Sequence, residues 1–212
     1  MELPLFPLHV VLFPGMAMPL HVFEDRYRAL MDHVLSGDRR FGIAAIRRGS
    51  EVGGYAETHR VGCIANVEQV TRSADGSMGI VVIGDQRFSI NVRLPDDPYP
   101  RAEVSILDEP AGLVGEGDLT VARAATHRYL SVVAKLQGEE VVAPSLPDDV
   151  VAASFILASA LGLDLSERQR LLEAEDAASR LHLLAELARR EATLLEAVGP
   201  SVGRPSGSYS PN

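Results

Sequence analysis

The chain has 212 residues, 46% hydrophobic and 23% charged, a balance typical of globular proteins. Its formal net charge of -9 argues against a broad nucleic-acid surface, because such a surface needs clustered cations. A single cysteine, Cys63, excludes an internal disulfide and fits a reducing cytoplasm.

The apolar opening stretch, Leu3 to Leu30, fits neither a secretion signal nor a membrane anchor. A signal needs a basic start and an unbroken apolar core, but position 2 is Glu and no Lys or Arg precedes Arg26. The segment nearest to a membrane span, Val150 to Leu163, would reach only about 20 Å as a helix. We therefore expect a soluble, cytoplasmic protein that does not bind a membrane.

Prolines and a glycine divide this opening stretch. Proline fixes φ and glycine accepts conformations that other residues avoid, so Pro14-Gly15 predicts a sharp turn. We expect one strand from Leu5 to Phe13 and a second from Met18 to Phe23. Helical spacing then predicts a helix from Glu24 to about Leu35, with Gly37 as its stop.

Short segments rich in β-branched residues fill the next part of the chain. They run from Phe41 to Ile46, Val61 to Val70, Met78 to Gly84, Gln86 to Leu94 and Arg101 to Leu107. Asp75-Gly76 is a strong hairpin cue, and Gly84-Asp85 has the composition of a turn. With the opening strand, these segments predict an antiparallel sheet curled toward a barrel.

From Asp118 onward the apolar period is that of helices. One stripe runs from Leu119 to Leu136 and ends at Gly138, and Asp148 or Asp149 can cap a helix that runs to Leu161. Ser166 with Gln169 has the pattern of a capping box, before a short and then a long helix. The predicted class is α+β, with a β-rich domain at 1–112, a helical bundle at 113–198 and a disordered tail at 199–212.

The residues also carry a family resemblance. The run LPLFPLHVVLFPGMAMPLHVFEDRYRALM resembles the opening of the Lon substrate-binding domain, the N-terminal domain of Lon proteases. Further likenesses follow in order: VGCIANVEQV with its hairpin, GDQRF, and the helical segment from Leu161 to Glu196. The resemblance covers residues 2 to 197 and implies a PUA-like pseudobarrel followed by a helical bundle.

The catalytic modules of a whole Lon enzyme have no counterpart in the sequence. An ATPase needs GxxxxGK[ST], but the only lysine, Lys135, has no glycine loop before it. Ser131 lies four residues before Lys135, where a Ser-Lys pair is possible, but a solvated lysine on an amphipathic helix is the favoured interpretation. We expect no enzymatic activity, and a recognition domain standing alone without ATPase and protease modules.

Neither a metal nor a cofactor is expected. The six histidines show no metal-binding spacing, although His9 and His21 could approach each other across the Pro14-Gly15 corner. Two polar histidines near strand ends are the favoured interpretation of that pair. Cys63 lies in an apolar strand, where buried thiols are usually inert.

An apolar surface near the corner is the candidate binding site. Flexible methionines suit surfaces that accept varied apolar partners. The favoured interpretation, however, is that Met16 and Met18 plug the barrel end or meet the helical bundle. Arg87 either orients a ligand or anchors the barrel rim, and the structural role is favoured. The candidate residues are Phe13, Met16, Met18, Leu20, Arg87 and Phe88.

The leading functional hypothesis is a non-catalytic module that binds unfolded or degradation-targeted proteins, as the resemblance implies, in partnership with a separate protease. An extended segment could add to an open sheet edge. The alternative is a small-molecule or regulatory site in the cleft between barrel and helices, or near His21, Glu24 and Asp25. Glu191 interrupts the apolar stripe of the last helix, so we expect a monomer or weak homodimer.

Overall fold

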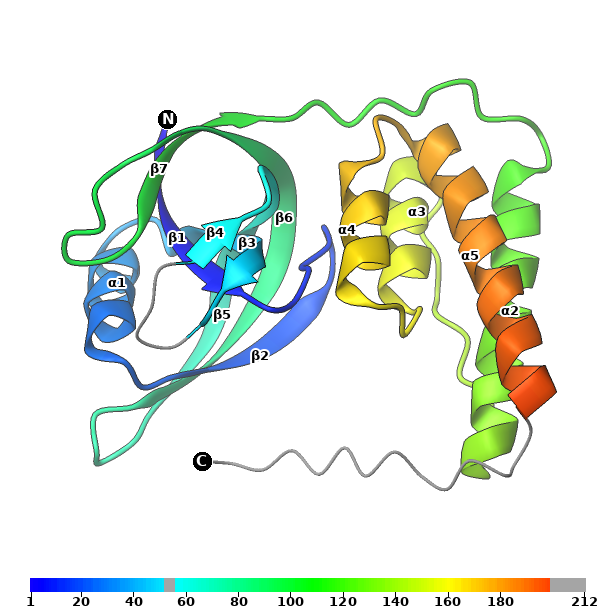
Figure 1. The fold of residues 1–212 in the computed structure, drawn as a ribbon, viewed down its shortest axis with the longest axis horizontal. Helices are drawn as coiled ribbons and strands as arrows, with labels where there is room; N and C mark the ends of the chain where they lie inside the picture. The colour runs from blue at the N-terminus through cyan, green and yellow to red at the C-terminus, as the bar shows by residue number, and fades with distance from the viewer. Residues whose placement is uncertain (52–55, 199–212) are drawn as a thin grey trace.

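The computed structural model describes residues 1–51 and 56–198 and shows two groups of elements side by side (Figure 1). We call them the β-part, Glu2 to Ile106, and the helical part, Asp118 to Val198. The strands are β1 (Glu2–Leu8), β2 (Ala17–Val22), β3 (Arg40–Gly49), β4 (Ala56–Thr58), β5 (Val61–Arg72), β6 (Met78–Arg93) and β7 (Arg101–Ile106). The helices are α1 (Asp25–Ser36), α2 (Asp118–Gln137), α3 (Val150–Ser159), α4 (Leu165–Glu173) and α5 (Ala177–Val198).

The strand pairings of the β-part close into a ring. β1 pairs with β7, β7 with β6, β6 with β5, β5 with β3, and β3 again with β1, while β2 attaches to β6 and β4 to β3. The predicted α+β class is confirmed, and the sheet is mostly antiparallel. The one parallel pairing, β1 with β3, was not expected. The long connection through β2 and α1 makes it possible, because it lets β3 return in the direction of β1.

The predicted turn at Pro14-Gly15 is confirmed. The amide of Met16 donates to the carbonyl of Phe13 at 3.0 Å, and Gly15 has a φ of 77°. Proline at the second position and a glycine with positive φ at the third are the residues that a type II turn requires. The strand before the turn is shorter than predicted, since β1 ends at Leu8.

The predicted turn at Gly84-Asp85 is wrong, because β6 runs straight through it. The amide of Gly84 donates to the Met16 carbonyl at 2.9 Å, and its carbonyl accepts from Gly15 at 2.8 Å. A Cβ atom on Gly84 would lie 2.1 Å from the carbonyl oxygen of Phe13. Glycine is therefore needed here for close backbone approach within a strand.

The Asp75-Gly76 hairpin is confirmed between β5 and β6, with the amide of Ser73 donating to the carbonyl of Ser77 at 2.9 Å. Gly76 adopts a φ of 82°, which an L side chain rarely takes. The three-residue strand β4 was not predicted. It is too short to carry a periodic pattern.

Two of the three predicted helix ends are confirmed. Gly138 ends α2 in the left-handed conformation, and Asp149 caps α3 by accepting from the Ala152 amide, as predicted. The capping box at Ser166 is wrong, since Asp164 caps α4 by accepting from the Glu167 amide. The sequence offers both an Asp and a Ser with an acidic or amide residue three positions later, and pattern alone does not choose between them.

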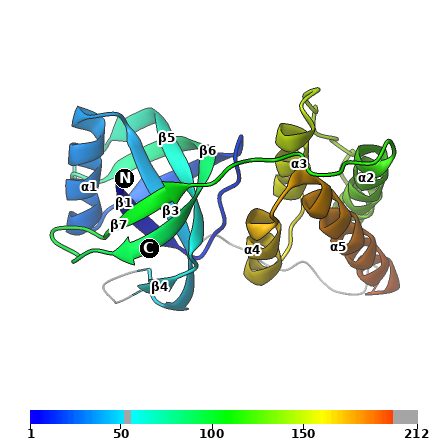
Figure 2. The same cartoon turned by 90° about the horizontal axis from the view of Figure 1, so that it is seen from above.

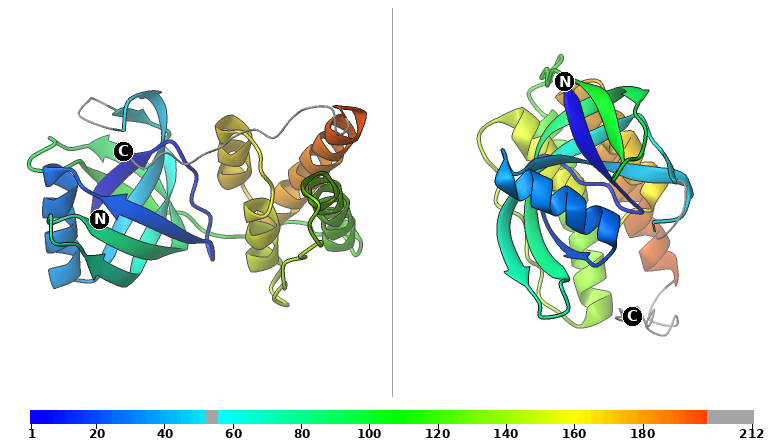
Figure 3. Two further views of the ribbon diagram at one scale, coloured as in Figure 1. Left: turned by 90° about the horizontal axis from the view of Figure 1, so that it is seen from below. Right: turned by 90° about the vertical axis from the view of Figure 1, so that its left-hand side faces the viewer.

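The helical part packs beside one face of the ring, while α1 lies on the side of the ring away from it (Figures 2 and 3). Helices α2 and α5 run parallel. Their ion pairs show this direction, since Asp118 pairs with His182 near the two starts and Arg128 with Glu196 further along both helices. In the described residues no helix combines the length and apolar character needed to cross a bilayer. The domain boundary at 112 falls between β7 and α2 and stays a prediction, and the predicted tail at 199–212 lies outside the described residues.

The close approach at Gly84 generates a stability prediction. Gly84→Ala should lower the free energy of unfolding by about 3 kcal/mol, because its methyl group would displace the Phe13 carbonyl and the turn. Gly79→Ala is the matched control in the same strand, since nothing lies within 4 Å of its Cβ position, and should stay within about 0.5 kcal/mol. Urea unfolding of both variants measures this. An equal decrease in the free energy of unfolding for both variants would show that β6 is destabilised by any added Cβ atom, and that the close approach of Gly84 to Phe13 is not the cause.

Candidate functional site

The predicted site residues divide by burial. Phe13, Met18, Arg87 and Phe88 are buried, whereas Met16 and Leu20 are half-buried. The first four are 0%, 5%, 2% and 0% exposed and present no surface to a partner in this structure. Whether any of the six binds a partner stays a prediction. Of the six, Met16 and Leu20 have accessible side chains.

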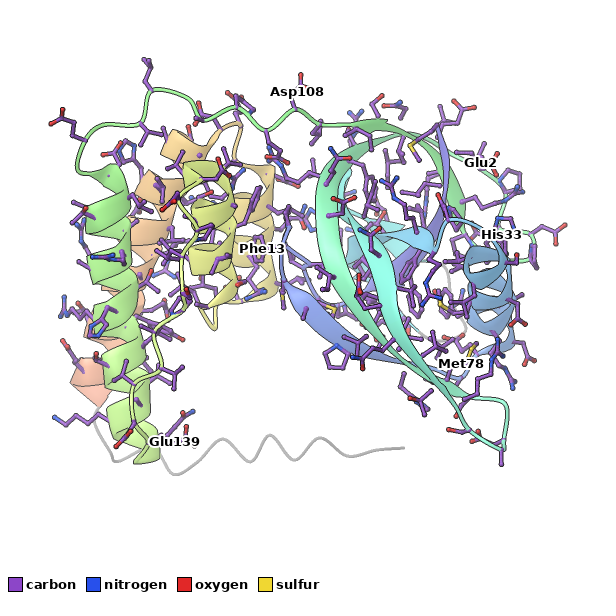
Figure 4. The ribbon with its side chains drawn as sticks, turned by 180° about the vertical axis from the view of Figure 1, so that it is seen from behind. Glu2, Phe13, His33, Met78, Asp108 and Glu139 are labelled. Carbon is purple, nitrogen blue, oxygen red and sulfur yellow. The ribbon has the colours of Figure 1, made fainter. Side chains whose placement is uncertain are left out.

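Phe13 belongs to the joint, the set of contacts between the β-part and the helical part. Its ring lies 6.5 Å from that of Phe155 on α3, and the guanidinium of Arg168 on α4 lies 5.0 Å from its centroid. Arg168 also donates to the carbonyl of Val11 at 3.3 Å and approaches the sulfur of Met16 at 3.7 Å. One apolar cluster therefore contains residues of both parts (Figure 4).

Arg87 crosses the joint from the middle of β6. Its Nη1 donates to the carbonyls of Leu172 and Ala174, at 2.6 and 2.7 Å, and its Nε pairs with Glu109 at 2.7 Å. The last carbonyls of a helix have no partner within the helix. Arg87 supplies donors to the end of α4, which accounts for an arginine inside an apolar region.

Arg180 on α5 is the residue that sequence reasoning missed. It is 0% exposed, its guanidinium lies 3.6 Å from the ring centroid of Phe155, and it donates to Ser154 Oγ at 2.8 Å. Burial, and then the charge of Arg87, lower the pKa of Arg180 to about 10. A signal was present: position 180 stands three residues after Ala177 and four before Leu184, on the apolar face of the helix.

A polar cleft opens beside the joint. It has a volume of 730 Å³, and its lining residues include Arg47, Glu57, His59 and Glu173. The charged groups pair with each other, Arg47 with Glu57 and His59 with Glu173 at 3.6 Å. These four groups are already engaged within the protein. Arg60 also lines the cleft, is exposed and forms no ion pair among the described residues, so it is the one charged lining residue left for a ligand.

The edge of β2 away from β6 is open. In the described part of the chain β2 pairs only with β6. Since Gly84 donates to Met16 and alternate residues of an antiparallel strand face its partner, the backbone groups of Ala17, Pro19 and His21 point to the open edge. These three side chains are also exposed. An open edge with free donors and acceptors is a template for pairing with another chain.

Apolar side chains accompany this edge. Leu20 lines a small cavity of 60 Å³ at the mouth of the barrel, together with Phe6, Leu8 and Tyr27. Phe6 and Tyr27 stack with centroids 4.0 Å apart, and burial raises the pKa of Tyr27 to about 12. Phe23, just after β2, is 47% exposed. The edge thus combines backbone polarity with accessible apolar surface.

The sequence-level nucleophile candidates have ordinary surroundings. Burial raises the pKa of the Cys63 thiol, which is 0% exposed and therefore disfavoured as a thiolate. The Ser131 hydroxyl donates to the carbonyl of His127 at 2.8 Å, and Lys135 is exposed. Within residues 1–51 and 56–198 no three His, Cys, Asp or Glu side chains are grouped to hold a metal ion.

A closed strand ring joined to a helical bundle through buried arginines, with an open sheet edge, defines an α+β protein with the features of a binding module. A family model described as the ATP-dependent protease La (LON) substrate-binding domain matches residues 2–190. The chain belongs to this family.

Relatives and solved structures agree. Lon protease 2 of Herpetosiphon aurantiacus is 31% identical over 201 residues, which cover 92% of this chain and 24% of that protein. Lon protease of Roseiflexus castenholzii is 30% identical over 204 residues, with 91% and 24% covered. The chain thus spans about a quarter of the length of these relatives.

Among solved structures, a Lon N-terminal domain protein from Xanthomonas campestris superposes with a TM-score of 0.67 at 26% identity, covering 88% of this chain and 98% of that one. The N-terminal domain of the Mycobacterium avium complex Lon protease gives 0.63 at 21% identity, covering 89% and 98%, and shares the fold.

The joint generates a second stability prediction. Arg87→Met should lower the free energy of unfolding by about 3 kcal/mol, because it removes the donors to Leu172 and Ala174 and leaves Glu109 without its short ion pair. Arg72→Met is the control, since Arg72 and Asp32 form an exposed pair, and should stay within about 0.5 kcal/mol. Small-angle scattering should also show a more extended particle for Arg87→Met alone. An unchanged scattering profile with full stability would mean that apolar packing suffices to hold the joint.

Proposed function

We propose that this chain is a non-catalytic recognition module that binds extended, apolar segments of unfolded or degradation-targeted proteins. The observation that carries the proposal is the open edge of β2. Two accessible apolar side chains of the predicted site accompany it, Met16 just before the strand and Leu20 within it. Membership of a family of substrate-binding domains supports the same class of activity.

The mode of binding follows from the edge. An extended segment that pairs with β2 receives backbone hydrogen bonds from Ala17 and His21, which any sequence can satisfy. Alternate side chains of the segment then fall beside Leu20 and Phe23, where apolar groups are preferred. Pro19 carries no donor, which limits pairing of this edge with copies of itself.

Phe13, Met18, Arg87 and Phe88 have supporting roles in this proposal. They hold the corner, the barrel interior and the joint, and so fix the position of the edge without contacting the bound segment. A bound segment would be passed to a separate protease, for which this chain acts as an adaptor.

A second candidate is a small-molecule or regulatory site in the polar cleft beside the joint. The size of the cleft, 730 Å³, lies within the usual range of ligand pockets. Four of its charged or titratable groups pair with each other, Arg47 with Glu57 and His59 with Glu173. Only the exposed Arg60 is left for a ligand, so we favour the β2 edge over this cleft.

The edge can be tested by removing one backbone donor. His21→Pro should weaken binding of a fluorescent, permanently unfolded protein at least about fivefold, because it deletes an outward amide and no hydrogen bond to β6. His21→Ala, which keeps the amide and loses only the ring, should bind within about twofold of the wild type. Fluorescence anisotropy measures both affinities.

Circular dichroism of both variants provides the folding control. Equal binding by His21→Pro and the wild type would show that the edge is not used. Equal loss in both variants would assign the contact to the imidazole and not to the backbone.

A further inference from the structure

A cavity in the helical part lies apart from the β2 edge and the joint. It has a volume of 430 Å³ and is formed by the first half of α2, by Ala143 and Pro144 of the following connection, and by Leu157 of α3. The α2 side chains that line it include Arg123, Ala124, Thr126 and His127. Ligand pockets in proteins typically measure about 300–1,000 Å³.

The wall of this cavity contains an orphaned polar group. Thr126 is 1% exposed, and its hydroxyl has no hydrogen-bond partner among the described residues. Burying a hydroxyl without a partner costs free energy, so such a group calls for an explanation. The hydroxyl itself has almost no accessible surface, so an acceptor inside the cavity would supply the missing partner only after the Thr126 side chain rotates toward it.

The rim carries an unpaired cation. The exposed side chain of Arg123 forms no ion pair or hydrogen bond within the part of the chain that the structure describes. His127 stands one turn further along α2, on the same rim. Glu139 follows the C-terminal end of α2, away from the half that lines the cavity (Figure 4). An unpaired cation at the opening of a cavity suits an anionic group.

We infer that this cavity binds a small ligand with an apolar body and a carboxylate head. The body fills the space against Ala124, Pro144 and Leu157, and the carboxylate meets Arg123 at the rim and accepts from the hydroxyl of Thr126. The same chemistry is offered by a free aromatic or aliphatic acid and by the C-terminal apolar residue of a polypeptide. The inference does not depend on the β2 edge, which lies in the other part of the molecule.

The test is a titration followed by two-dimensional amide and methyl NMR. The probes are phenylbutyrate and its neutral amide, and the tripeptide Gly-Gly-Phe with a free or an amidated C-terminus. We expect the acids to shift resonances of residues 120–127, 143–144 and 157, with a dissociation constant of about 1 mM for phenylbutyrate. The amides should bind at least about fivefold more weakly. Resonances of residues 17–22 in the same spectra report separately on the β2 edge.

Variants sharpen the test. Arg123→Gln should weaken acid binding about fivefold, whereas Lys135→Gln, an exposed cation further along the same helix, should not. Thr126→Val keeps the shape and removes the hydroxyl. It should weaken acid binding about threefold and leave the unfolding midpoint of the free protein unchanged or higher, because the hydroxyl is unpaired there.

Every result of this titration either supports the inferred ligand or overturns it. Binding of phenylbutyrate alone identifies a free acid as the source, and binding of the peptide alone identifies a polypeptide C-terminus. Equal binding of acids and amides, shifts confined to other residues, or none up to about 10 mM would overturn the inference. A lower midpoint for Thr126→Val would also overturn it, since the hydroxyl would then be bonded within the free protein.

Discussion

The arrangement of the whole molecule depends on the guanidinium of Arg87 at the end of α4. Helix α4 points its last carbonyls, with their partial negative charge, at the sheet, and these groups need donors. Arg87 reaches Leu172 and Ala174 from the middle of a paired strand, and Glu109 balances its charge. Because β6 is held on both sides by other strands, this contact ties the helical part to the rigid ring.

A second buried cation stands beside the first. Arg180 and Arg87 both approach the ring of Phe155, at 3.6 and 5.6 Å. Among the described residues, Glu109 is the one acidic side chain that pairs with both. The ring face attracts cations, and Ser154 and the carbonyl of Leu171 accept the remaining donors of Arg180. The pKa of Arg180 falls to about 10, still well above neutral pH. Arg180 therefore stays charged near pH 7, and the joint has no titration there that would open it through this residue.

Features that depend on neighbouring residues could be predicted from the sequence, whereas features that depend on contacts between distant segments could not. Pro14-Gly15, Gly138 and Asp149 act on their own neighbours, so their turn, stop and cap were predictable. Gly84 looked like a turn because the Phe13 carbonyl that requires it is about seventy residues away in the chain. The alternation of side chains along a strand explains why some candidate residues are buried and others are not. Met18 and Leu20 are two residues apart, so both point to the inner face of β2. Met18 is buried, whereas Leu20 stays partly accessible because it lies further along the strand.

The buried joint gives the two proposed binding regions a constant relation to each other. The β2 edge belongs to the ring and the α2 cavity to the bundle, and one apolar cluster with its arginines connects the two parts. Binding at either region then needs no rearrangement of the other. The affinity of each ligand is therefore not reduced by the free energy of ordering the joint. A polypeptide long enough to pair with β2 and place its C-terminal residue in the cavity would bind more tightly than either contact alone, because the second contact becomes intramolecular. Free acids would compete only for the cavity and leave the edge available, so the two regions would act as separable parts of one recognition surface.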